Sequence, residues 1–177
     1  ATKLGYARKA AAGIAQEKGG RRGPGNALSK TSIPALAAVF AATTGYPELF
    51  ALALAGAFAT AAFDTVSSEV GKAYGRRTYL ITTLRSVPRG TDGAVSLEGT
   101  VSGMAAALLL AGRGAALDLY PAAGIGAVAV AAFLATTLES VVGATLEKRG
   151  LLDNEAVNFL NSLAGALLAA AGGALLL

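Results

Sequence analysis

The chain alternates between long apolar runs and short charged segments, and this alternation constrains its fold more than any other feature. Charged residues make up only 15% of the 177 residues, against roughly 25% in an ordinary soluble domain. Apolar runs of this length are typical of helices that cross a bilayer. The sequence therefore predicts an all-α fold in the form of a polytopic transmembrane helix bundle.

The apolar runs divide the chain into a basic arm and a bundle. Residues 1–31 are predicted to be a juxtamembrane arm, with a helix over 2–16, because cations dominate this segment and glycines break it. Residues 32–177 are predicted to be the transmembrane catalytic bundle, with a cytoplasmic loop over 72–95. About five spans are expected, over residues 32–44, 48–71, 96–110, 122–146 and 156–177.

The distribution of Lys and Arg predicts the orientation. Of the fifteen cations, seven lie in 1–30, five in 72–89 and two at 148–149, with Arg113 the remaining one. Five spans place these three segments on one side, which the positive-inside rule makes the cytoplasm. We therefore expect a cytoplasmic N-terminus, an active site that faces the cytoplasm and the plasma membrane of a prokaryote. Because the cations flank apolar runs, membrane lipids rather than nucleic acid are the expected partners.

Two missing residue types narrow the chemistry. Without Cys there is no disulfide framework, thiolate zinc site or cysteine nucleophile, and without His the commonest general base is absent. A metal would have to be a hard cation held by oxygen atoms, which favours Mg²⁺.

The proposed topology brings polar groups from four helices to one membrane depth. We expect Asp64 and Glu69 to bind Mg²⁺, although a straight helix turns Glu69 about 140° away from Asp64, so the helix must end or bend there. The remaining groups at this depth are Glu98, Thr100, Glu139, Asn158 and Asn161. Glu98 or Glu139 would assist catalysis.

The loop over 72–95 is the predicted phosphate- and nucleotide-binding segment, because Lys and Arg suit phosphate groups. It is not a P-loop, since no Gly-Lys-Ser/Thr follows its glycines. Its candidate binding residues, together with those of the adjoining helices, are Lys72, Arg76, Arg77, Arg85, Arg89, Gly90, Thr91, Asp92, Gly93, Ser96, Thr100, Asn158 and Asn161.

Structural roles remain open for several of these residues. Asp64 could pair with Lys72 or an arginine, and Glu139 could be a helix-to-helix hydrogen-bonding group. The 90–93 turn could be only a tight turn, and the arginines could be membrane anchors. The small residues Gly165, Ala169 and Gly173 predict helix packing, either within the chain or in a homo-oligomer.

Two blocks carry a family resemblance: the run 64–71, and 87–100 with its Ser-x-Glu-Gly-Thr ending. They resemble the integral membrane family that includes plastid phytyl-phosphate kinase and transmembrane protein nineteen of animals. Glu139-Ser140 with Gly143, and Asn154, Asn158 and Asn161, resemble its later motifs. More distantly, the order of motifs is similar to dolichol kinase, phytol kinase and phosphatidate cytidylyltransferase. Members usually carry further spans before the segment matching Ala1, so an N-terminal part is expected to be missing.

The resemblance implies a CTP-dependent, Mg²⁺-dependent kinase that converts a phytyl or prenyl monophosphate to the diphosphate. Its expected partners are the lipid phosphate and the nucleotide. The rival hypotheses are a lipid cytidylyltransferase, a non-enzymatic lipid or ion transporter, and a non-catalytic membrane scaffold.

Overall fold

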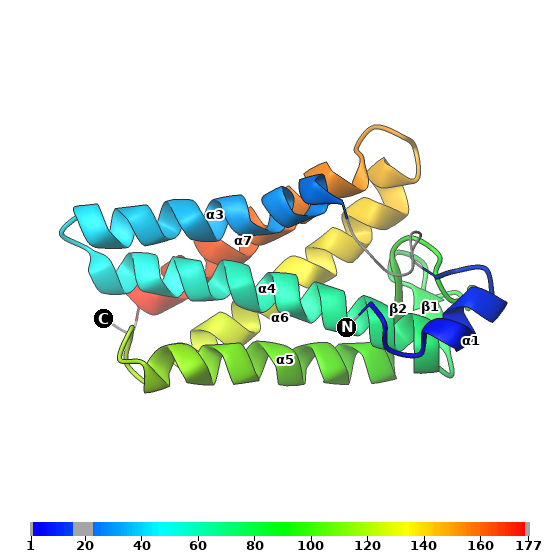
Figure 1. Ribbon diagram of the computed structural model, residues 1–177, viewed down its shortest axis with the longest axis horizontal. Helices are drawn as coiled ribbons and strands as arrows, with labels where there is room; N and C mark the ends of the chain where they lie inside the picture. Colours follow the sequence, from blue (N-terminus) through cyan, green and yellow to red (C-terminus); the bar gives the residue numbers. More distant parts are fainter. Residues whose placement is uncertain (1, 16–22, 176–177) are drawn as a thin grey trace.

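The computed structural model describes residues 2–15 and 23–175 as an elongated bundle of helices, with a small sheet at one end (Figure 1). The predicted helical class is confirmed. The elements follow the order α1 (Tyr6–Ala11), α3 (Pro24–Thr43), α4 (Pro47–Tyr74), β1 (Thr78–Leu80), β2 (Ala94–Ser96), α5 (Leu97–Ala116), α6 (Gly124–Val142), the π-helix η1 (Gly143–Glu147) and α7 (Asn154–Ala174).

Helix α4 lies at the centre and contacts α3, α5, α6 and α7. Small residues allow this close packing, as in many membrane bundles. A Cβ added at Gly56 of α4 would collide with Gly165 and Ala169 of α7, and one at Gly173 would collide with Leu52. The small-residue ridge of α7 therefore packs on α4 within the chain, as one of the two predicted alternatives had it.

Among the described residues, three helices are long and apolar enough to cross a membrane: Pro47–Tyr74, the continuous Gly124–Glu147, and Asn154–Ala174. The predicted count of five spans and the cytoplasmic N-terminus remain predictions. Large apolar side chains cover the outside of the bundle, such as Leu109, which is 73% exposed, and Leu167, which is 62% exposed. An outer surface of this kind suits lipid rather than water.

Several predicted boundaries were wrong. Helix α3 begins at Pro24 rather than at residue 32, so the proposed division at residue 31 falls inside a helix. Helix α5 continues past the expected end at residue 110 to Ala116. In this last part of α5, Gly114 allows close packing against Tyr120, because a Cβ added at Gly114 would lie 2.7 Å from the Tyr120 ring.

The segment 72–95 is not simply a loop. Helix α4 continues to Tyr74, and β1 pairs with β2 in antiparallel register, with Tyr79 opposite Val95. A strand of three residues carries too little alternation to be recognised from sequence. This hairpin, which continues directly into α5, fixes the position of the intervening 81–93 segment.

The N-terminal helix is also shorter than predicted. It covers Tyr6–Ala11 rather than 2–16, and Gln16 lies outside the described residues. Its residue Lys9 is only 1% exposed, although lysine is usually exposed to solvent. Lys9 is buried because it pairs with Glu69 of α4, while Arg8 lies over the Tyr74 ring, 5.3 Å from its centroid.

Candidate functional site

A cavity of about 560 Å³ lies at the end of the bundle that carries the β-hairpin. The start of α3, the last turns of α4, the 90–96 segment, the first turn of α5, the ends of α6 and η1, and the first turn of α7 all contribute to its wall. The convergence of four helices expected from the sequence is therefore present: Asp64, Thr100, Glu139 and Asn158 line one cavity from α4, α5, α6 and α7.

Helix α4 contributes one polar face to this cavity. Asp64 and Ser68 are separated by four residues and both line it, as do Ser67, Gly71 and Lys72. Asp64 pairs with Lys30 of α3, whose Nζ lies 2.5 Å from Oδ2 and also donates to Thr65 Oγ1 at 2.9 Å. The predicted structural partner of Asp64 was Lys72 or an arginine, and this was wrong.

Glu69 does not join Asp64. Helix α4 continues past it to Tyr74 without the expected end or bend, so its side chain leaves the helix on another face. Glu69 is 1% exposed, is paired with Lys9 and is not among the residues that line the cavity. The prediction that Asp64 and Glu69 share one metal ion therefore does not fit the arrangement.

The 90–93 turn closes the cavity on the hairpin side. Gly90, Thr91, Asp92 and Gly93 all line it. Gly93 has φ +72°, and a Cβ added there would lie 2.7 Å from the backbone nitrogen of Ala144 in η1. A glycine is required by both the left-handed conformation and the close contact. The turn is thus held directly against η1.

Helix α5 begins at the cavity and is capped by Ser96. Ser96 Oγ accepts a hydrogen bond from Gly99 N–H at 3.1 Å, which satisfies one free donor of the first turn. Gly99 lets α5 approach α4, since a Cβ there would lie 2.5 Å from the Ser67 carbonyl oxygen. Ser96, Gly99 and Thr100 line the cavity, but Glu98 does not. Glu98 instead accepts from the backbone N–H of Arg76 at 3.2 Å.

Helices α6 and α7 supply linked carboxylate and amide groups. Asn161 Nδ2 donates to Glu139 Oε2, and Asn158 Nδ2 donates to the carbonyl oxygen of Asn154 at 2.7 Å. Glu139 and Asn158 line the cavity, whereas Asn161 is buried outside the lining and contacts Glu139 through this hydrogen bond. The helix-to-helix role weighed for Glu139 is thus present alongside its position in the cavity wall.

The π-helical turn η1 brings in an acid that the sequence analysis missed. Glu147, on η1, lines the cavity, and so does Glu155, on the first turn of α7. Single π-turns inserted at the end of an α-helix are frequent at functional sites. The only sequence signal was that both acids flank the 148–153 loop on the side assigned to the site.

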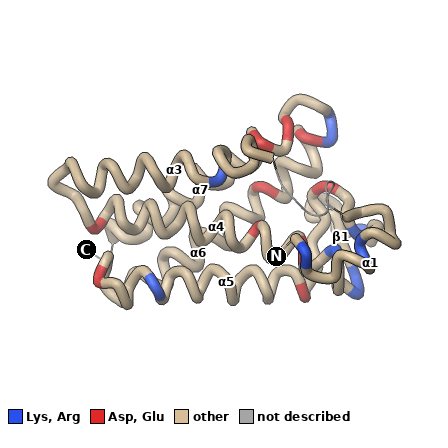
Figure 2. Tube along the Cα trace, in the orientation of Figure 1, with Lys and Arg blue, Asp and Glu red and all other residues tan. Residues whose placement is uncertain are grey.

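The four arginines predicted to bind phosphate do not line the cavity. Arg76, Arg77, Arg85 and Arg89 are exposed, and none belongs to the cavity lining. The hairpin turns them outward, and Figure 2 shows Lys and Arg gathered around α1 and β1. Lys72 is the only cation among the described residues of the lining.

The described lining is therefore strongly acidic. Besides Lys72, the charged residues of this lining are five acids: Asp64, Asp92, Glu139, Glu147 and Glu155. They are spread around the wall, and no group of three or more among residues 2–15 and 23–175 could hold a metal ion. An acidic wall of this kind suits hydrated cations, or cations that arrive with a ligand, better than a bare anion.

Comparison with known proteins identifies the family. The family described as Integral membrane protein DUF92 matches residues 1–166. This chain belongs to the DUF92 family. It is therefore an integral membrane protein, as its helices and their apolar outer surface indicate.

Three relatives of the DUF92 chain are similar over most of its length. An uncharacterized membrane protein of Synechocystis is 48% identical over 95% of the chain and 66% of its own length. Protein VTE6, chloroplastic, of Arabidopsis thaliana is 38% identical over 96% of the chain and 53% of its own length. An uncharacterized membrane protein of Methanocaldococcus jannaschii is 36% identical over 81% of the chain and 59% of its own length. The chain thus spans between about half and two thirds of these relatives. No solved structure matches it.

Proposed function

We propose that this DUF92 protein is a membrane-bound phosphotransferase that moves the γ-phosphoryl group of CTP to a phytyl or prenyl monophosphate. The P–O bond between the β- and γ-phosphates breaks, a P–O bond to the acceptor's phosphate oxygen forms, and CDP leaves. The observation that carries the proposal is the cavity at the end of an apolar bundle, whose described lining holds five acids and Lys72. Similarity to VTE6, and the resemblance to the phytyl-phosphate kinase family, support the choice of reaction.

The donor groups of the cavity fit Mg²⁺. The wall offers carboxylate, hydroxyl and amide oxygens, and the sequence contains no His or Cys. Mg²⁺ is commonly held by one or two carboxylates plus water and substrate phosphates, which does not require a group of three acids. Asp64 and Glu139, on facing helices, are the residues proposed to hold it. When bound, Mg²⁺ would neutralise charge on the nucleotide phosphates.

The chain's own groups would position the phosphates. Lys72 provides a point charge at the wall. Ser96 uses its oxygen to accept from Gly99, so its O–H remains able to donate into the cavity. An acceptor that is already a phosphate needs little general-base assistance, which is consistent with a site that lacks His. Catalysis would then come from positioning and charge stabilisation.

The orientation follows from the same site. A nucleotide substrate requires that the cavity open to the compartment that contains nucleotides. We therefore propose that the hairpin end faces the cytoplasm of a prokaryote and that the bundle lies in its plasma membrane, in agreement with the positive-inside rule.

Radiolabelled CTP tests the proposal directly. The purified chain in liposomes is incubated with Mg²⁺, phytyl monophosphate and either [γ-³²P]CTP or [α-³²P]CTP. Transfer of the γ-label into a lipid diphosphate supports the kinase. Transfer of the α-label with release of pyrophosphate would instead indicate a lipid cytidylyltransferase. Absence of both products, with prenyl monophosphates of several lengths, would reject both activities.

A further inference from the structure

The innermost part of the cavity has a different character from its acidic rim. On α4 the lining residue farthest from the hairpin end is Phe63, and on α6 it is Phe133. Their rings pack edge to face, with centroids 6.2 Å apart. Phe63 is only 3% exposed. An aromatic pair therefore forms the inner wall, next to Asp64 and about two turns from Glu139.

Phe133 lies where the cavity lining meets exposed residues of α6. Its side chain lines the cavity and is 39% exposed. Val130 and Leu134, its neighbours on α6, are 57% and 43% exposed. The outer surface beside Phe133 is thus apolar and suited to lipid.

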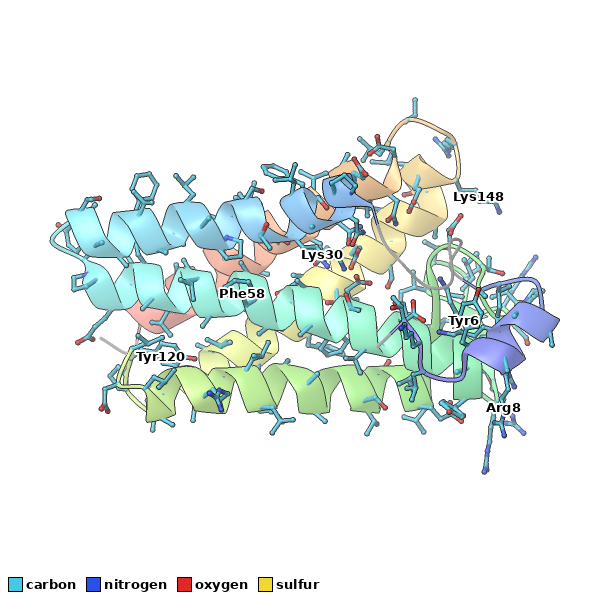
Figure 3. The ribbon with its side chains drawn as sticks, in the orientation of Figure 1. Tyr6, Arg8, Lys30, Phe58, Tyr120 and Lys148 are labelled. Atoms are coloured by element: carbon cyan, nitrogen blue, oxygen red, sulfur yellow. The ribbon has the colours of Figure 1, made fainter. Side chains whose placement is uncertain are left out.

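Helices α5 and α6 both contribute residues to the cavity wall. The two helices meet at the corner formed by Tyr120 (Figure 3) and diverge toward the hairpin end, as Figure 1 shows. Helix α5 is held against α4, because a Cβ at Gly103 would lie 2.7 Å from the Phe63 ring. On the hairpin side, the contact of Gly93 with η1 bridges the separation. Thr100 of α5 and Phe133 of α6 both line the cavity, so the two separating helices each contribute to this part of its wall.

We propose that the cavity opens laterally between α5 and α6 past Phe133, and that the branched hydrocarbon chain of an isoprenoid phosphate occupies this opening. The inference rests on the proposed function and adds the route and the specificity-determining residue for the acceptor. A long apolar chain is costly to transfer to water, so a substrate that keeps its chain in the bilayer needs a side entrance. The phosphate would then reach the acidic cavity while the chain stays against Phe133.

Photocrosslinking tests the opening without requiring activity. The full chain in liposomes is irradiated with phytyl monophosphate that carries a diazirine in the middle of its chain, and adducts are mapped by mass spectrometry. Non-specific labelling by probe dissolved in the bilayer should occur on every outer face of the bundle, and unlabelled phytyl monophosphate should not reduce it. Adducts near Thr100 on α5 and Phe133 on α6 should fall at least fivefold when unlabelled phytyl monophosphate is added. Competed adducts confined to α3 and α7, or no competed adducts, would overturn the proposal.

A matched pair of variants tests the role of Phe133. Phe133 and Phe159 are both 39% exposed, but Phe159, on α7, is not among the lining residues. In F133A, the concentration of phytyl monophosphate that halves the competed adduct should rise at least fivefold, while F159A should match the unmodified protein. Equal values in both variants would overturn the assignment. If the proposed phosphotransferase activity is wrong but the lateral opening is right, the radiolabel assay should give no lipid diphosphate while the competed adducts persist.

Discussion

Lys30 of α3 and Asp64 of α4 form an ion pair at the edge of the cavity, with Nζ 2.5 Å from Oδ2 and side chains 12% and 17% exposed. The pair joins a residue of the predicted basic arm to the acid predicted to bind Mg²⁺. It holds the Asp64 carboxylate in place and leaves Asp64 in the cavity lining. The arm is thus part of the site rather than an appendage to it.

Replacing Asp64 should strongly reduce catalysis, and the loss of its ion pair with Lys30 should also lower the free energy of unfolding. Asp64→Asn keeps the shape of the side chain but removes the charge that Lys30 and Mg²⁺ would share, so transfer from CTP should fall at least about 100-fold, or about 2.7 kcal/mol in transition-state stabilisation. The measurement is diphosphate formation per folded protein. Glu48→Gln is the control, because Glu48 is an exposed acid in the first turn of the same helix. Full activity of Asp64→Asn would refute its assignment.

Glu69 should contribute to stability and not to Mg²⁺ binding. It is buried against Lys9 and does not line the cavity. Glu69→Gln should lower the free energy of unfolding, and a double-mutant cycle with Lys9→Met should give a coupling energy of about 0.5–3 kcal/mol. The Mg²⁺ concentration for half-maximal activity should stay unchanged. A tenfold rise in that concentration would restore Glu69 as a metal ligand.

Gly93→Ala should lower the stability of the protein by more than the conformational strain at a positive φ alone would. The positive φ costs about 1–2 kcal/mol for an L-residue, and the added Cβ would also strike η1. Gly150→Ala is the matched control, because Gly150 has φ +70° and no atom within 4 Å of an added Cβ. Thermal unfolding of the two variants isolates the contact with η1. Equal destabilisation would mean that the turn does not pack there.

Tyr120→Phe should destabilise the corner between α5 and α6. The hydroxyl donates to the Ala111 carbonyl oxygen at 2.8 Å, and Tyr120 is 3% exposed. Losing this bond should cost about 1 kcal/mol, measured by denaturant or thermal unfolding in detergent. Tyr46→Phe serves as the control, since Tyr46 is 68% exposed and should be nearly neutral.

The same tyrosine predicts a pH dependence. Burial raises the pKa of the Tyr120 hydroxyl above its ordinary value near 10. Because the folded pKa is the higher one, this contribution to stability is present below pH about 10 and is lost as the pH rises through the folded pKa. The unfolding temperature of the unmodified protein should fall more between pH 9 and 11 than that of Tyr120→Phe. Parallel curves would contradict the prediction.

Local regularities made much of the fold predictable from sequence. Apolar runs indicated the helices, and the predicted spans at 48–71, 122–146 and 156–177 each fall largely within helical segments of the structure. The small-residue ridge indicated close packing. Each of these follows from helix geometry or backbone hydrogen bonding within a few residues of the chain.

Contacts between distant segments decided the rest. A hairpin of two three-residue strands positions the segment that carries Arg85 and Arg89, and a π-turn brings Glu147 into the cavity wall. Pairing with Lys9 and Lys30 gives Glu69 and Asp64 different roles. The sequence by itself determined an apolar helical bundle with its acids toward one end. Only the tertiary structure decided which acids face the cavity, because helix phase and ion-pair partners depend on packing between segments far apart in the chain.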